Sequence, residues 1–571
     1  MSPVSDSATF MIPSLSLGLS RQDAVIFAAG AGLACHFAFK SMEPRRPLAH
    51  AVLLLVAPFV LSLILEESFE HRGQAFVLTF GIYLASLVTS LVVYRLSPFH
   101  PLARYPGPIL CKLSKLWLAY KCLSGKQHIY YEELHNKYGP VVRTGPNELS
   151  FCDASVIAPL MGPNGLPKGP IWEGRRLSKQ KTKTLIALTD AKDHARRRKP
   201  WLRGLNSTAL KDYEIIIERR TSQLVSALAA QKGAVDMTQW ISFFAYDFMS
   251  DMAFGGGSEM MSSGDTGGLW HMLENGLADV LPLGHVPWVT TYYRMLPGLG
   301  KNRKRFQAFA VARAQIRKAE GSMQKDLFHY LFNEDGAEAT PPPMHEGVSD
   351  GALAIVAGSD TTATAIATVI WYLLQNRAAY TRLQAEIDAN FPPGEEPTNT
   401  TRQAGMSYLN AVINEALRLF PPVLGGSQRA VPQGAGAKAI GPHVLPEGTV
   451  AFVHFYSIHR RPEYFSPMPD AFIPERWLPA DQPGSLHSPD YKGDVRHDTS
   501  AFVPFSFGPA ICAGKTLAYQ EMRLVLCWLL QQFDMRFADG FVPEKWEEDL
   551  RDCFLTIKGP LLVSLTPRNA S

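Results

Sequence analysis

The distribution of hydrophobic positions changes after the first hundred residues of the chain. Before that point, nearly continuous apolar runs cover 24–39, 48–65 and 75–94. The last two approach the roughly 20 residues that a helix needs to cross the hydrocarbon core of a bilayer. The first run is shorter and contains His36. We predict an N-terminal membrane region, 1–96, with up to three transmembrane helices; the alternative is a set of buried core helices.

Long amphipathic stretches dominate from residue 114 onward, with short β-prone runs such as 141–151 and 449–454 between them. Apolar residues at helical spacing predict amphipathic helices, and short runs rich in β-branched residues predict strands. The stretch 97–113 is rich in Pro and breaks helices, so we predict a hinge there. The remainder, 114–571, is expected to be one large domain, mainly α with a minor β-sheet region.

Charged residues are distributed unevenly around the apolar runs. The loop after the first run and the segment after the third are basic, whereas the loop between the second and third is acidic. The residues are, in chain order, Lys40, Arg45 and Arg46; Glu66, Glu67 and Glu70; and Arg95, Arg104, Lys112 and Lys115. Basic loops remain on the cytosolic side of a membrane, so three spans would leave everything after residue 94 in the cytosol. The glycosylation sequons at Asn206, Asn399 and Asn569 are therefore expected to stay unmodified.

Composition excludes some classes of function. The 571 residues carry a formal net charge of only +4, with no zinc module and no long basic tail, so nucleic acid is not an expected partner. The seven cysteines are odd in number and scattered along the chain. This usage is typical of a reducing compartment rather than of a disulfide framework.

One cysteine lies in a glycine-flanked loop that leads into a predicted helix. In Phe505-Ser-Phe-Gly-Pro-Ala-Ile-Cys-Ala-Gly514, residues Gly508 and Gly514 let the backbone turn tightly around Cys512 and approach a flat ligand closely. Phe505 is expected to shield that face from water. Such a loop can present a thiolate to haem iron, and a thiolate ligand favours cleavage of the O–O bond. The alternative is a buried structural cysteine.

The pattern Phe-x-x-Gly-x-x-x-Cys-x-Gly resembles the haem-binding signature of the cytochrome P-450 superfamily. The resemblance begins in the Pro-rich stretch and continues to the C-terminus, and 137–143 resembles the first sheet of fungal members. It implies a cytochrome P-450 fold preceded by transmembrane helices, as in the membrane-bound microsomal type. It also implies haem b as cofactor, with Cys512 as the axial ligand of the iron.

The stretch 349–374 reads as a long apolar helix interrupted by small and polar residues at 357–362. Thr hydroxyls that bond back to helix carbonyls, beside a glycine, predict a kink and a groove. The stretch resembles the distal-helix motif of the family. By that resemblance Thr361 holds activated dioxygen by a hydrogen bond and Asp360 relays protons to it. The alternative is an ordinary Ser/Thr-rich helix.

Glu415 and Arg418 lie three residues apart in a helical run, so their side chains share one face. Together with Arg476 they resemble the Glu-Arg-Arg lock of the family. The resemblance implies that Glu415 bridges both guanidinium groups in a buried network.

The two propionates of haem need cations, and three residues resemble the family's partners for them: His194, Arg198 and Arg429. The family usually has Arg two residues before the ligand cysteine, where this chain has Ala510. One propionate contact is therefore expected to be missing. The other basic residues of 194–203 are expected either to dock an acidic electron donor or to form a solvated charge run.

The segments that the family layout places above the iron, 167–172, 352–356, 423–426 and 554–555, are nearly all apolar, and no buried charge is expected among them. We therefore predict a haem-thiolate monooxygenase of the endoplasmic reticulum membrane, multi-pass, with its catalytic domain in the cytosol. Its substrate is expected to be lipophilic, a terpenoid or other fungal secondary metabolite.

No dinucleotide fingerprint occurs in the chain, so electrons are expected from NADPH through a separate reductase, with cytochrome b5 as a further donor. Two alternatives remain. One is a haem-thiolate isomerase or dehydratase that needs no reductase, against which Asp360 and Thr361 argue. The other is a non-catalytic membrane protein that binds haem or lipid.

Overall fold

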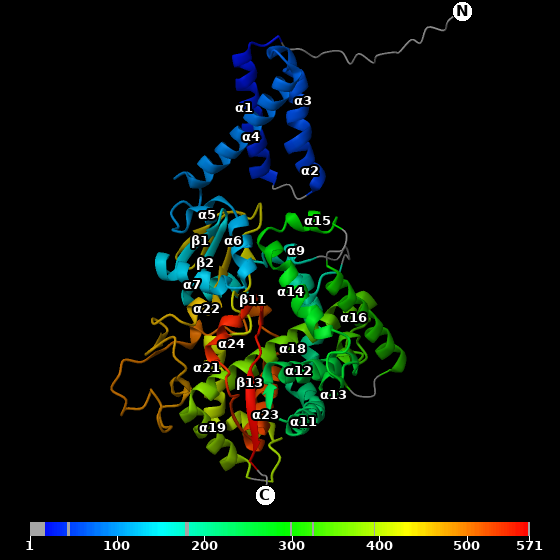
Figure 1. Ribbon diagram of the computed structural model, residues 1–571, viewed down its shortest axis with the longest axis vertical. Coiled ribbons are helices and arrows are strands. Elements are labelled where there is room, and N and C mark those ends of the chain that lie inside the picture. Colours follow the sequence, from blue (N-terminus) through cyan, green and yellow to red (C-terminus); the bar gives the residue numbers. More distant parts are fainter. Residues whose placement is uncertain are drawn as a thin grey trace, which may run out of the picture. The chain divides into compact units, whose positions relative to one another are not determined.

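The computed structural model of the chain describes residues 18–42, 46–176, 182–296, 300–321, 325–392 and 394–568. The described residues form two compact units (Figure 1). The N-terminal unit comprises the chain up to Arg104 together with Trp288–Pro297, and the main unit comprises Tyr105–Pro287 and Gly298–Ser571. Arg45 and Asn569, used in the topology and glycosylation predictions, lie outside the described residues.

Three long apolar helical segments form most of the N-terminal unit. They are α1 (Arg21–Met42); α2 (Pro47–Ala51) continued by a π-helical turn (Val52–Val56) and α3 (Ala57–Ile64); and α4 (Arg72–Leu96). α15 (Val289–Tyr293) also belongs to this unit. By length and composition all three segments could cross a membrane. Large apolar side chains cover their outer surface, Phe37 being 70% and Val77 66% exposed. Such a surface is typical of contact with an apolar phase.

α1 and α4 pack closely because small residues lie at their crossing. A Cβ atom on Gly32 would lie 2.0 Å from Ser86 Oγ and 2.4 Å from the carbonyl oxygen of Tyr83. The Ser86 hydroxyl donates a hydrogen bond to the carbonyl oxygen of Ala29 at 3.1 Å. Small residues and interhelical hydrogen bonds of this kind hold helices together where water is excluded.

The main unit is predominantly helical, which confirms the predicted fold class. Its helices are α5 (Ile109–Leu113), α6 (Leu116–Lys121), α7 (Gln127–Tyr138), α8 (Ile157–Met161), α9 (Ile171–Gly174), α10 (Ala191–Gly204), α11 (Ser207–Ala229), α12 (Met237–Phe254), α13 (Met260–Ser263), α14 (Leu269–His285), α16 (Lys301–Glu320), α17 (Leu327–Leu331), α18 (Met344–Gln375), α19 (Arg377–Asn390), α20 (Thr400–Gly405), α21 (Ser407–Leu419), α22 (Phe455–Ile458), α23 (Lys515–Gln532) and α24 (Pro543–Asp549).

The strands form small sheets, and the two predicted β-prone runs belong to the same one. This sheet has the order β1 (Val141–Gly145), β2 (Glu148–Phe151), β7 (Val450–Val453), β4 (Arg429–Ala430), with β1 antiparallel and β7 parallel to β2. A second sheet has the order β10 (Phe533–Phe537), β13 (Leu562–Pro567), β3 (Ala234–Asp236). The two-stranded pairs are β11 (Arg551–Cys553) with β12 (Leu555–Ile557), β5 (Lys438–Ile440) with β6 (His443–Leu445), and β8 (Phe465–Ser466) with β9 (Arg496–His497).

α18 is the central helix of the main unit. It is apolar and long enough to cross a membrane, but 72% of its most apolar window is buried inside the protein. It packs along α12 and also contacts α21 and α23. Figure 1 shows these helices gathered around it. A helix that is apolar on most sides is stable in water only when other elements cover it.

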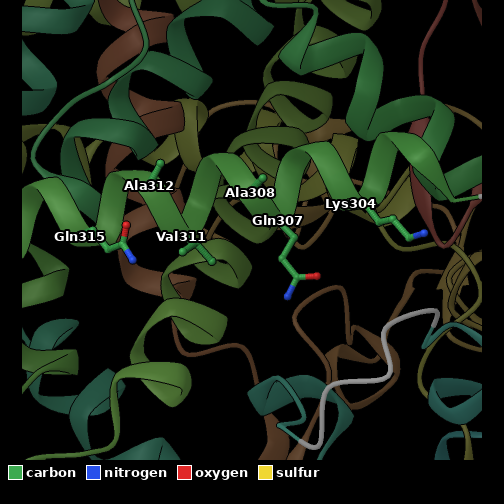
Figure 2. Close-up of a pocket in the computed structure, with 6 residues that line it drawn as sticks. All are labelled: Lys304, Gln307, Ala308, Val311, Ala312 and Gln315. Carbon is green, nitrogen blue, oxygen red and sulfur yellow. The ribbon is translucent and has the colours of Figure 1, made fainter.

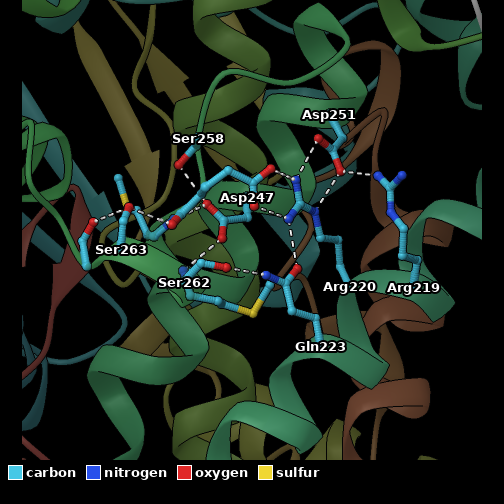
Figure 3. A network of polar contacts seen from close by, with 12 residues as sticks. Arg219, Arg220, Gln223, Asp247, Asp251, Ser258, Ser262 and Ser263 are labelled. Carbon is cyan, nitrogen blue, oxygen red and sulfur yellow. Dashed lines mark hydrogen bonds and ion pairs between the residues drawn. The ribbon is translucent and has the colours of Figure 1, made fainter.

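A buried ion-pair network fastens α11 to α12 (Figure 3). Arg220 donates to Asp251 Oδ2 from Nε at 2.7 Å and to Oδ1 from Nη2 at 2.9 Å, and its Nη1 donates to Glu259 at 2.8 Å. The side chain of Arg220 is only 6% exposed. Its neighbour Arg219 contacts the same carboxylate at 2.7 Å but is 58% exposed.

The network predicts unequal effects for these two adjacent arginines. Replacing Arg220 by Met should lower the free energy of unfolding by about 3 kcal/mol, because two carboxylates lose their buried cation. Arg219→Met, the matched control, should cost at most about 1 kcal/mol, because water screens an exposed pair. The midpoint of urea unfolding of the two variants checks this, and equal shifts would contradict it.

Candidate active site

The Cys512 loop lies between a short 3-10 turn at Gly508–Ala510 and the start of α23. The backbone N–H of Cys512 donates to the carbonyl oxygen of Phe505 at 2.9 Å, which closes the loop. The loop lies against a cavity, which its thiol lines. Enclosure raises the pKa of the thiol, while the N–H of Gly514 and the charges of Arg198 and Lys515 lower it. A metal ion at the sulfur would deprotonate it outright.

Gly508 is required in this loop for two reasons. Its φ is +70°, in the left-handed region, and a Cβ atom there would lie 2.2 Å from the carbonyl oxygen of Met161. The loop therefore packs directly on the end of α8, which any larger residue would prevent. Phe505 also lines the cavity, and its ring lies 5.4 Å from that of Tyr519 on α23.

The structure brings the three residues of the predicted lock together. Arg418 donates to both carboxylate oxygens of Glu415, from Nε at 2.9 Å and from Nη2 at 2.8 Å, and Arg476 Nε donates at 2.9 Å. The indole N–H of Trp477 and the backbone N–H of Ile473 complete the shell, at 2.8 and 2.9 Å. Burial alone would raise the pKa of Glu415, but the two arginines hold it below its usual value. Glu415 is therefore a fully paired buried anion.

Arg418 extends this network to the cysteine loop through His459. Arg418 Nη1 donates to the carbonyl oxygen of His459 at 2.7 Å. The His459 ring lies 3.1 Å from the carbonyl oxygen of Arg418 through Nδ1, and its Nε2 accepts the backbone N–H of Val503 at 3.0 Å. The carbonyl of Val503 accepts the N–H of Ser506 at 2.9 Å. Burial lowers the pKa of His459 to about 3, so the ring stays neutral and can accept.

The cavity beside Cys512 encloses about 1670 Å³ of space that no atom fills, a volume that includes the open mouth. The residues that line it are mainly apolar. All four sequence segments predicted to lie above the iron contribute to its wall, through residues such as Lys168, Ala354 of α18, Val423 and Phe554. Thr361 of α18 also lines it. One cavity thus contains both Cys512 and the predicted distal threonine.

Three basic side chains line the cavity, Lys168, His194 and Arg198, and Arg429 lies near Lys168 and His194 without lining it. Burial, Arg429 and Arg198 lower the pKa of Lys168 to about 7, and burial, Lys168 and Arg198 lower that of His194 to about 4. Nε and Nη2 of Arg429 are buried and have no hydrogen-bond partner among the described residues. Basic side chains that lower one another's pKa, with free donors on Arg429, form a site for a ligand that carries negative charge.

Lys168 was missed as a site residue, and the prediction of a lining without buried charge is wrong. Lys168 lines the cavity and donates from Nζ to the carbonyl oxygens of Leu185 and Ile186 at 3.1 and 2.8 Å. The signal in the sequence was one lysine within the apolar segment 167–172. Glu521 of α23 was also missed: it lines the cavity, and burial raises its pKa well above the usual range.

Thr361 and Asp360 are adjacent in sequence but occupy different surroundings. The Thr361 hydroxyl donates to the carbonyl oxygen of Ala357 at 2.6 Å, at the wall of the cavity. Asp360 is not among the residues that line the cavity, and its carboxylate is buried. α18 is continuously helical through this segment. A Cβ atom on Gly358 would lie 2.4 Å from the Met249 sulfur, so this glycine permits close packing on α12.

The remaining arginines of α10 have ion-pair partners within the protein, and both predicted roles of this basic segment stay predictions. Arg196 pairs with Asp193 and Glu346, Arg197 with Asp350, and Arg203 with Asp335 and Glu338. The buried pair of Arg197 and Asp350, at 2.6 Å, joins α10 to α18. These side chains orient α10 so that His194 and Arg198 face the cavity.

A second hollow lies along α16 and shares no residue with this site (Figure 2). It is lined by Lys304, Gln307, Ala308, Val311, Ala312 and Gln315. None of these six side chains is a carboxylate, a thiol or an imidazole, and Lys304 is the one ionisable residue among them.

Comparison with known proteins agrees with this geometry. A family model described as Cytochrome P450 matches residues 104–564. The chain belongs to the cytochrome P450 family. It is accordingly a cytochrome P450 monooxygenase, and the cofactor of the family is haem-thiolate iron.

Several fungal P450 proteins are similar over most of their length. Cytochrome P450 67 of Uromyces fabae is 32% identical over 544 residues, which cover 94% of this chain and 98% of the relative. Trichothecene C-15 hydroxylase of Fusarium sporotrichioides is 32% identical over 86% of this chain and 97% of its own. Tryprostatin B 6-hydroxylase of Aspergillus fumigatus is 30% identical over 86% and 85%.

The residues present fit the haem of this family. The free donors of Arg429 and the cations beside it provide for two carboxylates, although Ala510 supplies none. Lys168, which the sequence analysis did not identify, adds a basic side chain to the predicted propionate partners. These partners lack the arginine that the family usually has at the position of Ala510.

Replacing Glu415 by Ala should abolish stable folding, because two buried guanidinium groups lose their anion at a cost of about 3–5 kcal/mol. Glu475→Gln is the matched control, since this carboxylate is 26% exposed and accepts hydrogen bonds from Tyr408 and Arg382. Because the folded-state pKa of Glu415 is lowered, its stabilising effect should be complete at neutral pH and lost as the pH falls through that value. Haem content and urea midpoints against pH test this.

Lys168→Met should weaken haem retention by about tenfold or more, as expected for a charged hydrogen bond lost in a buried site. Lys168→Arg should restore it. Lys183→Met is the control, because Lys183 pairs with Glu173 at 2.7 Å and does not line the cavity. Transfer of haem to apomyoglobin measures retention, and equal rates for Lys168→Met and wild type would contradict the assignment.

Proposed function

We propose that this P450 inserts one oxygen atom of O2 into a lipophilic fungal secondary metabolite, such as a terpenoid, and reduces the other atom to water. The observation that carries the proposal is the cavity that Cys512 and Thr361 both line, together with the basic side chains Lys168, His194 and Arg198. Its mainly apolar wall suits a lipophilic substrate. Two relatives named as hydroxylases of trichothecene and of tryprostatin B support the same substrate class.

The site residues divide into those that hold the cofactor and those that serve the chemistry. Cys512 would supply the thiolate ligand of the iron, in a loop formed by Phe505, Gly508 and Gly514. His194, Arg198, Arg429 and Lys168 would hold the propionates. When bound, haem supplies oxygen activation, which a thiolate ligand favours. The Thr361 hydroxyl can rotate from the Ala357 carbonyl to donate into the cavity, and Asp360 supplies protons to it.

Electrons are proposed to come from NADPH through a separate reductase, with cytochrome b5 as a further donor. The three apolar helical segments are proposed to cross the endoplasmic reticulum membrane, with the main unit in the cytosol. The region 1–96 would then be the membrane region, 97–113 the hinge and 114–571 the catalytic domain. The family match begins at residue 104, within this hinge.

The visible spectrum of the reduced protein with carbon monoxide tests the proposal. The wild type should show the strongly red-shifted Soret band of a thiolate-ligated haem, and both Cys512→Ala and Cys512→His should lose it. With reductase present, the wild type should oxidise NADPH in an oxygen-dependent manner. An imidazole-type band in the wild type would refute the ligand assignment, and turnover without NADPH would favour an isomerase or dehydratase.

A further inference from the structure

Phe554 occupies a strained turn at the wall of the cavity. It is the single residue between β11 and β12, and its φ is +79°, in the left-handed region that a bulky side chain rarely adopts. The residue also lines the cavity, together with Leu555. Such a conformation is costly and persists only where the surrounding structure enforces it, so the contacts of this turn require an explanation.

Hydrogen bonds fix the backbone of the turn but do not reach the ring. The N–H of Phe554 donates to Asp552 Oδ1 at 3.0 Å, and the N–H of Asp552 donates to the carbonyl oxygen of Gly125 at 2.7 Å. On the other side, both the N–H and the hydroxyl of Thr556 donate to the carbonyl oxygen of Pro422 at 3.1 Å. The turn is therefore anchored at both ends, and the direction of the ring depends on what packs against it.

Arg175 and Trp172 contact the Phe554 ring from outside the cavity. Cζ of Arg175 lies 4.7 Å from the centroid of the Phe554 ring, and the Trp172 ring meets it edge-on at 4.9 Å, with an angle of 83° between the planes. Neither Arg175 nor Trp172 lines the cavity. A guanidinium over an aromatic face and an edge-to-face aromatic pair are both attractive, and the first is stronger where water is excluded. Arg175 is only 7% exposed, so its contact is of the stronger kind.

Close packing of α9 on α14 fixes the position of Arg175. The arginine directly follows α9, and a Cβ atom on Gly174 would lie 2.0 Å from the carbonyl oxygen of Leu283. A Cβ atom on Gly284 would lie 3.0 Å from Nε of Arg175. Glycines on both helices thus allow the close approach that packs the arginine side chain. Burial raises the pKa of Asp552 and the charge of Arg175 lowers it, so the arginine lies near the carboxylate of the turn as well as its ring.

We propose that Arg175 is a positioning residue that holds the Phe554 ring at the wall of the cavity and so limits the size of ligand that fits beside Cys512. The arginine acts through the ring and does not itself contact the ligand. Without its guanidinium, the hydrogen bonds of the turn would remain, but the ring could move into the space that the arginine fills and leave room for bulkier molecules. This inference rests on the proposed function in one respect: the ligand limited in this way is its lipophilic substrate.

Binding of azoles to the ferric holoenzyme tests this, because their imidazole nitrogen ligates the iron and shifts the Soret band without reductase or turnover. Imidazole reports access to the iron, and clotrimazole, whose imidazole carries a bulky triaryl group, reports the room around it. Arg175→Met and Arg175→Lys should each lower the Kd of clotrimazole about threefold or more and leave that of imidazole unchanged. The lysine variant keeps the charge near Asp552 but loses the flat group that stacks on the ring. Arg551→Met, which replaces an exposed arginine on β11, is the matched control and should change neither Kd.

A double variant decides whether the arginine acts through the ring. Phe554→Ala alone should lower the Kd of clotrimazole as the arginine variants do, and Arg175→Lys should add nothing in the Phe554→Ala background. Unchanged or weaker clotrimazole binding in Arg175→Lys would overturn the proposal, and so would an equal effect of Arg175→Lys with and without the ring. Because the titration needs bound haem but no electron transfer, a wild type that binds azoles without oxidising NADPH would refute the proposed function alone.

Discussion

The bridge from Glu415 to Arg418 and Arg476 is the interaction on which the rest of the site depends. It joins α21 to the segment that precedes the cysteine loop. Both carboxylate oxygens of Glu415 accept hydrogen bonds in this bridge. Because Arg418 also fixes His459, and the His459 ring accepts the Val503 N–H, the same network reaches the loop that carries Cys512. The loop that carries the predicted iron ligand is thus connected by hydrogen bonds to fully buried charges.

The basic side chains of the candidate site differ from other buried charges of the main unit in lacking a carboxylate partner within the described part of the chain. On α10, Arg197 has a buried partner in Asp350, whereas the cluster of Lys168, His194 and Arg429 has no carboxylate partner among the described residues. Burying unpaired cations is costly in the absence of an anion. The main unit therefore concentrates unsatisfied positive charge where an anionic cofactor would satisfy it, and pairs its charges elsewhere.

Much of the candidate site could be predicted from the sequence because its motifs lie within short stretches of the chain. The loop from Phe505 to Gly514 needs its glycines at fixed positions, and Glu415 and Arg418 lie on one helical face by spacing alone. Lys168 was missed because a lysine in an apolar segment is usually solvated, and only folding showed that its amino group meets two carbonyls inside the protein. The ion pairs of the other arginines of α10 were missed for a similar reason: their partners, such as Glu346 and Asp335, are distant in the sequence.

The sequence by itself determined the long apolar helices and the mainly helical class, and it predicted the thiolate loop, because these follow from runs and spacings within about thirty residues. Only the tertiary structure decided which charges are paired and which face of α18 each side chain occupies. Asp360 and Thr361 are neighbours in the chain, yet one is buried near Lys558 and the other lines the cavity. Successive residues of a helix point about 100° apart, and what each one meets depends on the elements that pack there.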